Sequence, residues 1–188
     1  MDLDFFANTI GTPFKREPIS SCWNTSKATV VVDKTPFEVT TFRIDGEYED
    51  NRHPNNVTFT DSLFKDLSRR DFTINAMAAD IDGNVIDFFN GIDDLNRKII
   101  RCVGDPYERF NEDALRILRA TRFQVKISGN IESNTFHHMN KCAHLLRNVA
   151  TERIQKELNG ILIGGDGCSQ VAELLHSIDV LKVVVPEI

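Results

Sequence analysis

The chain has 188 residues, of which 41% are apolar and 27% charged, an ordinary globular composition that excludes wholesale disorder. No apolar run approaches the roughly 20 residues of a membrane-spanning helix, and Met1–Asp4 is acidic where a signal peptide is basic. We therefore expect a cytoplasmic protein with no membrane partner. The net charge of −6 argues against a general nucleic-acid binder, so any RNA contact must use local basic clusters.

The first half of the chain is predicted to form short strands and helices. Val, Thr and Phe dominate Thr29–Asp33 and Phe37–Arg43, which predicts two strands joined by a turn at Lys34–Pro36. A short helix is expected at Ser62–Ser68.

A second hairpin follows in the sequence. Ala76–Ile81 and Asn84–Phe89 flank the pair Asp82-Gly83, a strong hairpin signal. A short helix at Asp93–Lys98 and a strand at Lys98–Val103 are predicted next.

After Gly104 the pattern becomes helical. Asp105 is a suitable cap for a helix that runs to about Lys126, with Pro106 in its first turn. Further helices are predicted from Ser133, from Thr151 to before Gly164, and over Ser169–Leu181. These elements predict an α+β chain, with a small α/β head followed by a helical region.

The four cysteines lie too far apart in sequence to indicate a CxxC-type zinc or redox site. We expect four reduced and mostly buried thiols. They are Cys22, Cys102, Cys142 and Cys168.

One stretch of the long predicted helix has the chemistry to recognise a base. Asp113, Arg116 and Arg119 recur every third residue, and Arg122 continues this stripe. A carboxylate accepts from an exocyclic amine and a guanidinium donates to a ring nitrogen, so an Asp113/Arg116 fork selects cytosine and adenine over guanine and uracil. The alternative is a solvated helix face with i,i+3 ion pairs.

A second polar cluster lies at residues 69–76. Arg70 is a candidate phosphate ligand, and Asp71 and Asn75 are candidates for ribose hydroxyls. The alternative is a helix end that Asp71 caps.

Three carboxylates are candidate metal ligands. Nucleotidyl transfer needs a divalent metal held by oxygen ligands. Asp2 and Asp4 lie on one face of an extended segment, and Glu38 in the Phe37–Arg43 strand adds a third acid. The alternative for Asp2 and Asp4 is exposed terminal charge.

Motifs spread over nearly the whole chain point together to one family. They are Phe37–Gly46, Tyr48, Asp50, Arg52, Pro54, Val57, Phe59, Asp66-Leu67, Arg69–Ala76, Asp87, Gly91–Leu95, Ile99–Pro106, Arg109–Arg116 and Thr151–Ile154. Jointly they resemble the motifs of class II tRNA nucleotidyltransferases and bacterial poly(A) polymerases.

The resemblance implies an architecture and an activity. It implies a polymerase-β-like nucleotidyltransferase head over residues 1–104, incomplete at its N-terminus. An all-helical neck over 105–165 would carry the nucleotide-reading helix, and 166–188 would begin a helical body. The implied reaction is template-independent addition of C and A, from CTP and ATP, to the tRNA 3′ end, with release of pyrophosphate at two Mg²⁺ ions.

The resemblance also assigns roles to single residues. Asp113 and Arg116 are implied to pair with the incoming base, while Arg70, Arg119 and Arg122 contact the nucleotide. Asp2 and Asp4 match the family's catalytic, metal-binding Asp-x-Asp, and Glu38 matches a strand acid that assists them.

Departures from the family pattern keep two alternatives open. The family has a Gly-Gly…Arg-Asp segment before its Asp-x-Asp, and Phe88 and Asn90 replace its usual Pro and Gly. One alternative is therefore a split or truncated fragment that binds nucleotide and RNA and needs a partner chain to supply that segment. The other is a poly(A) polymerase, although those tend to carry Pro-Val where Ala114-Leu115 stands.

Overall fold

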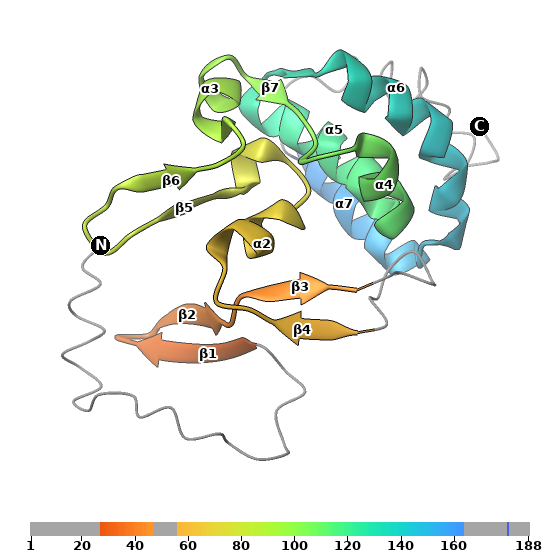
Figure 1. The fold of residues 1–188 in the computed structure, drawn as a ribbon. Helices are drawn as coiled ribbons and strands as arrows, with labels where there is room; N and C mark the ends of the chain where they lie inside the picture. Colours follow the sequence, from red (N-terminus) through yellow and green to blue (C-terminus); the bar gives the residue numbers. More distant parts are fainter. Residues whose placement is uncertain (1–26, 47–55, 164–179, 181–188) are drawn as a thin grey trace.

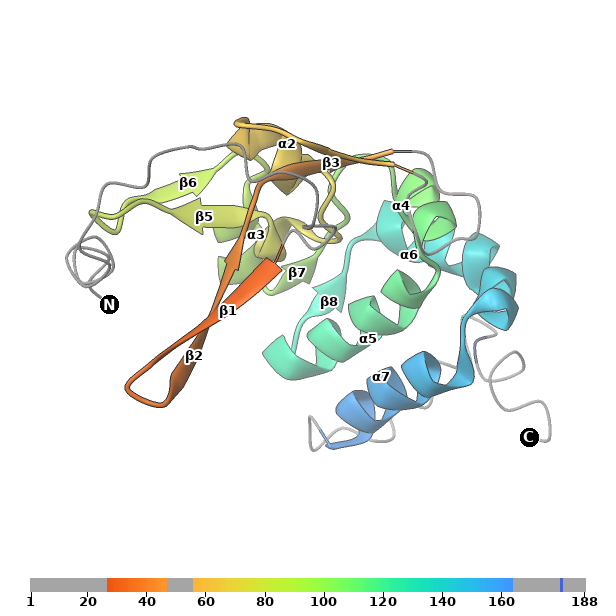
Figure 2. The ribbon, with the colours of Figure 1, turned by 90° about the horizontal axis from the view of Figure 1, so that it is seen from below.

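The computed structural model describes residues 27–46, 56–163 and 180 (Figure 1). Short hairpins and short helices from the first part of this range lie at one end, and longer helices from the second part pack at the other (Figure 2). The mixed α and β composition confirms the predicted fold class. Within the described part of the chain, no helix combines the length and apolar character needed to span a bilayer.

The first hairpin consists of β1 (Lys27–Val32) and β2 (Thr35–Thr40), which pair antiparallel. Asp33 and Lys34 form its two-residue turn, with φ of 48° and 65°, the left-handed pair that matches strand twist in tight hairpins. The predicted turn at 34–36 is therefore wrong by one residue, because Thr35 already pairs with Val32.

The predicted strand over residues 37–43 is divided into two. The hairpin strand stops at Thr40, and Arg43 begins β3 (Arg43–Asp45), which pairs antiparallel with β4 (Val57–Phe59). The predicted helix follows as α2 (Leu63–Ser68), capped by the Ser62 side chain, which accepts from the Lys65 N–H. This arrangement places β3 directly against α2.

The second hairpin is confirmed, with shorter strands than predicted. The elements here are η1 (Thr73–Asn75), β5 (Met77–Ala79), β6 (Val85–Asp87), α3 (Gly91–Asn96) and β7 (Ile99–Ile100). Gly83 provides the positive φ of 83° at the hairpin turn. Gly91 permits close packing, since a Cβ there would lie 2.3 Å from the Thr73 carbonyl oxygen. The predicted strand at 98–103 is reduced to β7 and an isolated bridge between Phe72 and Cys102.

The predicted long helix is broken at Asp113. It forms two helices, α4 (Pro106–Glu112) and α5 (Leu115–Ile127). Asp113 has extended backbone angles, φ −149° and ψ 101°, and its Oδ1 accepts from the Leu115 N–H at 3.1 Å. Short acidic side chains compete for backbone N–H groups in this way, which favours a cap over a helix interior. Asp113 therefore lies at the start of α5 rather than one turn along a shared helix with Arg116.

The last described helices begin where the sequence predicts. They follow in the order β8 (Asn130–Ile131), α6 (Ser133–Cys142), η2 (Ala143–Asn148) and α7 (Thr151–Ile163). The strand β8 pairs in parallel with β7, and α7 packs along α5. Most of the predicted helix at 169–181 lies outside the described residues. Val180 is described and is buried.

The main core crosses the predicted head–neck boundary at Gly104. Phe72 and Ile100 come from before Gly104, and both pack in the same buried cluster as Phe110 and Leu118. The domain limits at 104 and 165 stay predictions, but the first of them does not separate two cores.

Two of the four cysteines are described, and both are free, buried thiols as predicted. Burial raises the pKa of Cys102 to about 12 and also raises that of Cys142. Such thiols are protonated and unreactive at neutral pH. Cys22 and Cys168 lie outside the described residues.

Candidate nucleotide-binding site

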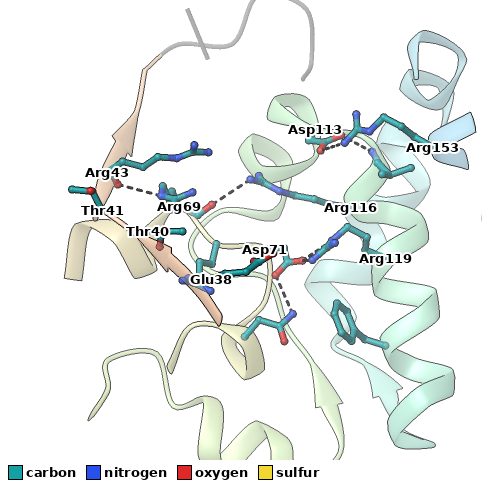
Figure 3. A pocket seen from close by; sticks show the side chains of 14 residues that line it. Glu38, Thr40, Thr41, Arg43, Arg69, Asp71, Asp113, Arg116, Arg119 and Arg153 are labelled. Carbon is teal, nitrogen blue, oxygen red and sulfur yellow. Dashed lines mark hydrogen bonds and ion pairs between the residues drawn. The ribbon is translucent and has the colours of Figure 1, made fainter. Parts of the chain in front are cut away.

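A pocket of about 650 Å³ opens between the hairpin strands, the end of α2, and the helices α5 and α7 (Figure 3). Six arginines and three carboxylates line it, an excess of three positive charges in a chain of net charge −6. This reversal of charge favours an anionic ligand. The lining residues are Glu38, Thr40, Thr41, Arg43, Arg69, Arg70, Asp71, Asn75, Asp113, Leu115, Arg116, Arg119, Phe123 and Arg153.

Asp71 is the centre of one network in this pocket. Its buried carboxylate accepts from Arg119 Nε at 2.8 Å through Oδ2 and from Asn75 Nδ2 at 3.1 Å through Oδ1. The same Oδ1 accepts from the Phe72 N–H at 2.9 Å. Two segments far apart in sequence, residues 71–75 and α5, are thus joined at the pocket wall, as the dashed lines in Figure 3 show.

Arg116 is held in place by groups from both sides of the helix break. Its Nη1 donates to the Arg109 carbonyl oxygen at 2.8 Å and to Glu112, and its Nη2 donates to the Arg69 carbonyl oxygen at 3.2 Å. Glu112 also pairs with Arg109. Because the residue is only 9% exposed, these bonds fix the guanidinium in one orientation at the pocket wall.

Asp113 lines the same pocket but has a different partner. While its Oδ1 caps α5, its Oδ2 accepts from Arg153 Nη2 of α7 at 2.8 Å. A carboxylate offers about four acceptor sites, so these two bonds orient Asp113 and leave capacity for a ligand amine. Asp113 and Arg116, the two members of the predicted fork, therefore share a pocket and are each positioned by separate residues.

Asp66 organises the opposite wall at the end of α2. Its Oδ1 accepts from Arg69 Nη2 at 2.6 Å and from the Arg43 N–H at 3.2 Å. Burial opposes ionisation of this carboxyl, but the bonds from Arg69 and Arg43 and the charges of Arg69 and Arg70 outweigh it. They hold the pKa of Asp66 below its usual value.

Arg70 and Glu38 also line the pocket, as predicted for a ligand site. Arg70 is exposed and its Nη2 lies 3.4 Å from Asp66 Oδ2, a long contact. Glu38 is exposed on β2. Both side chains are accessible to a ligand in the cavity.

Arg122 is not among the residues that line the pocket. Its Nε donates to Glu157 Oε2 on α7 at 2.6 Å, and its guanidinium lies 4.5 Å from the centre of the Phe123 ring. A Cβ at Gly160 would lie 2.7 Å from Arg122 Cδ, so α7 approaches α5 closely here. The predicted nucleotide contact of Arg122 stays a prediction, and its described partners are those of an interhelical ion pair.

The predicted metal ligands are only partly described. Asp2 and Asp4 lie outside the described residues, and Glu38 lies at the pocket. Among the described residues there is no group of three or more His, Cys, Asp or Glu side chains placed to hold a metal ion. The described part of the chain therefore does not by itself form the predicted magnesium site.

Sequence reasoning missed several residues of the pocket. Arg43 and the neighbouring Thr40 and Thr41 follow Glu38 in the same motif, and Arg153 belongs to the Thr151–Ile154 motif. The motif membership was the available signal. That these residues reach the cavity depends on how β3 and α7 pack against α5, which no local pattern specifies.

Sequence comparison finds two family models on this chain. The model described as "Poly A polymerase head domain" matches residues 2–101, and that described as "Probable RNA and SrmB- binding site of polymerase A" matches 130–188. Among curated proteins, the CCA-adding enzyme of Limosilactobacillus fermentum is 52% identical over 130 residues, which cover 69% of this chain and 32% of that enzyme. That of Streptococcus gordonii is 49% identical over 134 residues, or 71% of this chain and 34% of that enzyme. The chain thus spans about a third of the length of these relatives.

Solved structures give the same grouping. The Bacillus stearothermophilus CCA-adding enzyme in complex with CTP aligns with a TM-score of 0.74 and 37% identity, covering 82% of this chain and 37% of that chain. The Thermotoga maritima CCA-adding enzyme in complex with tRNA aligns with a TM-score of 0.70 and 28% identity, covering 85% of this chain and 36% of that chain.

Proposed function

Because this chain belongs to the family of class II tRNA nucleotidyltransferases and bacterial poly(A) polymerases, we propose that it carries the nucleotide-reading site of a CCA-adding tRNA nucleotidyltransferase. The proposed reaction adds C and A from CTP and ATP to the tRNA 3′ end without a nucleic-acid template. One observation carries the proposal. Asp113 and Arg116, the two groups that suit cytosine and adenine, line one pocket with an excess of positive charge.

Base recognition follows from the donor and acceptor pattern. The Asp113 carboxylate accepts from N4 of cytosine or N6 of adenine, and the Arg116 guanidinium donates to N3 or N1 beside it. Guanine and uracil present a carbonyl where Asp113 needs a donor, so they leave a half-buried carboxylate unpaired, which is costly. Because Arg116 and Asp113 are anchored by Glu112 and Arg153, the pair is oriented before a nucleotide arrives.

The remaining predicted contacts suit the sugar and phosphates. Asp71 and Asn75 are hydrogen-bonded to each other and face the cavity, where they are proposed to bind ribose hydroxyls. Arg70 is proposed to bind phosphate, and Arg119 orients Asp71 through its two hydrogen bonds to Oδ2. Arg122 is proposed to act on the nucleotide indirectly, by fixing α7 against α5.

The proposed chemical step is an in-line displacement. The tRNA 3′-hydroxyl oxygen forms a bond to the α-phosphorus, the bond from that phosphorus to the bridging oxygen breaks, and pyrophosphate leaves. Magnesium, with Asp2, Asp4 and Glu38 as proposed ligands, would supply the charge stabilisation that this reaction needs. The described residues contribute the positioning of base and sugar.

The RNA partner is proposed from the second half of the chain. Residues 130–188 match the family's probable RNA-binding segment, and α6, η2 and the α7 helix lie within that range. The tRNA 3′ end is the substrate that this arrangement and the proposed reaction require. The cytoplasm is the proposed location.

The test is incorporation of labelled CTP and ATP into tRNA that lacks its CCA end. We expect addition that stops after C, C and A, by this chain alone or together with a partner chain that supplies the family's Gly-Gly…Arg-Asp segment. A ladder of long A-tails would instead identify a poly(A) polymerase. Binding of CTP with no incorporation under either condition would identify a binding fragment, and absence of both binding and incorporation would refute the proposal.

A further inference from the structure

Arg43 projects into the pocket from the wall opposite α5, where the base-reading pair lies (Figure 3). We propose that Arg43 binds the polyphosphate of the incoming nucleotide, opposite the base contacts of Asp113 and Arg116. This inference rests on the proposed function and adds a ligand-binding residue to the same site.

The backbone of Arg43 is fixed by the end of α2. Its N–H donates to Asp66 Oδ1 at 3.2 Å, and its carbonyl oxygen accepts from Arg69 Nε at 3.1 Å. Residues on β3 and α2 thus anchor the point from which the side chain starts. These two bonds do not involve the Arg43 side chain, so they survive its substitution.

The guanidinium of Arg43 is held much less firmly. Its Nε lies 2.9 Å from Asp45 Oδ1, an ion pair, yet this nitrogen is buried and makes no hydrogen bond within the described part of the chain. The Asp45 carboxylate is shared with Arg69, whose Nη1 lies 3.4 Å from Oδ2. The Arg43 side chain is 31% exposed, and its tip points into the cavity in Figure 3.

Comparison of the six pocket arginines distinguishes Arg43 and Arg70 from the rest. The other four each hydrogen-bond a carboxylate at 2.8 Å or less, and breaking those bonds to bind phosphate would leave a carboxylate without its partner. Arg70 lies 3.4 Å from Asp66, and Arg43 has an ion pair without hydrogen-bond geometry. The four bound arginines are Arg69, Arg116, Arg119 and Arg153.

A planar guanidinium with five N–H donors suits a phosphate group, which accepts from two of them at once. Arg43 and Arg70 lie on the β3–α2 side of the cavity, and the base-reading pair lies on the α5 side. A nucleotide whose base meets α5 therefore has its phosphates directed towards the two arginines with the weakest internal contacts. Arg43 is the one of these that sequence reasoning did not identify.

The experiment measures binding of CTP, CMP and cytidine to the full 188-residue chain by calorimetry, at one fixed magnesium and salt concentration. Arg43→Ala is expected to weaken CTP binding about tenfold, since a hydrogen bond to a charged group is lost. Cytidine binding is expected to stay unchanged, and CMP to be affected less than CTP. Arg43→Lys, which keeps the charge but not the fork, is expected to give an intermediate loss.

Arg97→Ala is the matched control. Arg97 pairs with Asp93 at 3.2 Å, its side chain is 62% exposed, and it does not line the pocket. This variant is expected to bind all three ligands as the unmodified chain does. Thermal unfolding of each variant checks that the fold is retained, and Arg43→Gln replaces Arg43→Ala if the latter does not fold.

Three results would overturn the inference. Equal losses for CTP, CMP and cytidine would mean that Arg43 acts only on the structure of the pocket. Unchanged CTP binding in Arg43→Ala, with CTP still bound more tightly than cytidine, would remove Arg43 from the phosphate site while the proposed function stands. No nucleotide binding by the unmodified chain would overturn both.

Discussion

The Arg153 guanidinium donates to Asp113 Oδ2 at 2.8 Å, and this ion pair joins α7 to the break between α4 and α5. The pair links residues 40 positions apart in the sequence. It gives the proposed base acceptor a fixed orientation, because the other carboxylate oxygen is already committed to the α5 N-terminus. The predictions below separate these two roles of Asp113 from each other and from the rest of the pocket.

Asp113→Ala removes the base acceptor and the helix cap together. We expect CTP and ATP binding both to weaken about tenfold or more, because one residue reads both bases. The free energy of unfolding is expected to fall by about 1 kcal/mol from loss of the cap. Calorimetry and urea unfolding measure the two effects, with Asp93→Ala, an exposed acid of α3, as the control.

Asp113→Asn separates the two effects, since an amide oxygen still caps the helix. We expect near-normal stability with weakened CTP and ATP binding. Unchanged binding of either nucleotide in both variants would contradict the base-reading assignment.

Arg153→Ala leaves Asp113 in place without its ion-pair partner. CTP binding is expected to weaken, but less than in Asp113→Ala, because the acceptor remains and only its orientation is lost. A double-mutant cycle of the two residues is expected to give a coupling energy of roughly 0.5–3 kcal/mol in CTP binding. Additive effects would show that Arg153 reaches the nucleotide by a route independent of Asp113.

Arg122→Ala tests the role of the residue whose sequence-based assignment the geometry does not favour. Loss of the bond to Glu157 is expected to lower the free energy of unfolding by about 1–3 kcal/mol, because a buried carboxylate loses its partner. CTP binding under native conditions is expected to change by less than about twofold, well under one hydrogen bond. A tenfold loss of CTP affinity with normal stability would instead restore the direct nucleotide contact.

Asp66→Asn is expected to be most destabilising at neutral pH. The folded pKa of Asp66 lies below its ordinary value of 3.8, so the charged carboxylate stabilises the fold above that pH. This contribution is lost as pH falls through the folded pKa. The difference in unfolding free energy between Asp66→Asn and the unmodified chain, measured by urea unfolding at pH 7, 5 and 3, is expected to shrink towards pH 3. A difference that stays constant with pH would contradict this.

The sequence predicted those features whose cause is local. The Asp82-Gly83 signal predicted the second hairpin because Gly83 has the positive φ that such turns need. Ser62 and Asp105 were recognised as caps because their side chains accept from N–H groups two or three residues later.

Features that depend on tertiary packing were missed. The pattern from Asp105 to Lys126 is helical throughout, and the break at Asp113 exists because its side chain caps α5 and meets Arg153 from α7. Arg122 follows Arg119 on the predicted stripe, yet drift around the helix turns it towards Glu157. The register of neighbouring helices decides which arginine of a row reaches a cavity.

The core that crosses Gly104 has a consequence for how this chain denatures. Phe72 and Ile100 on one side of that glycine, and Phe110 and Leu118 on the other, are buried by each other rather than by separate neighbours. A cut between the two halves would expose apolar surface on both. The limits of the two family models therefore mark where homology is strongest and not where cooperativity ends, and the described elements on either side of Gly104 melt together in a single transition.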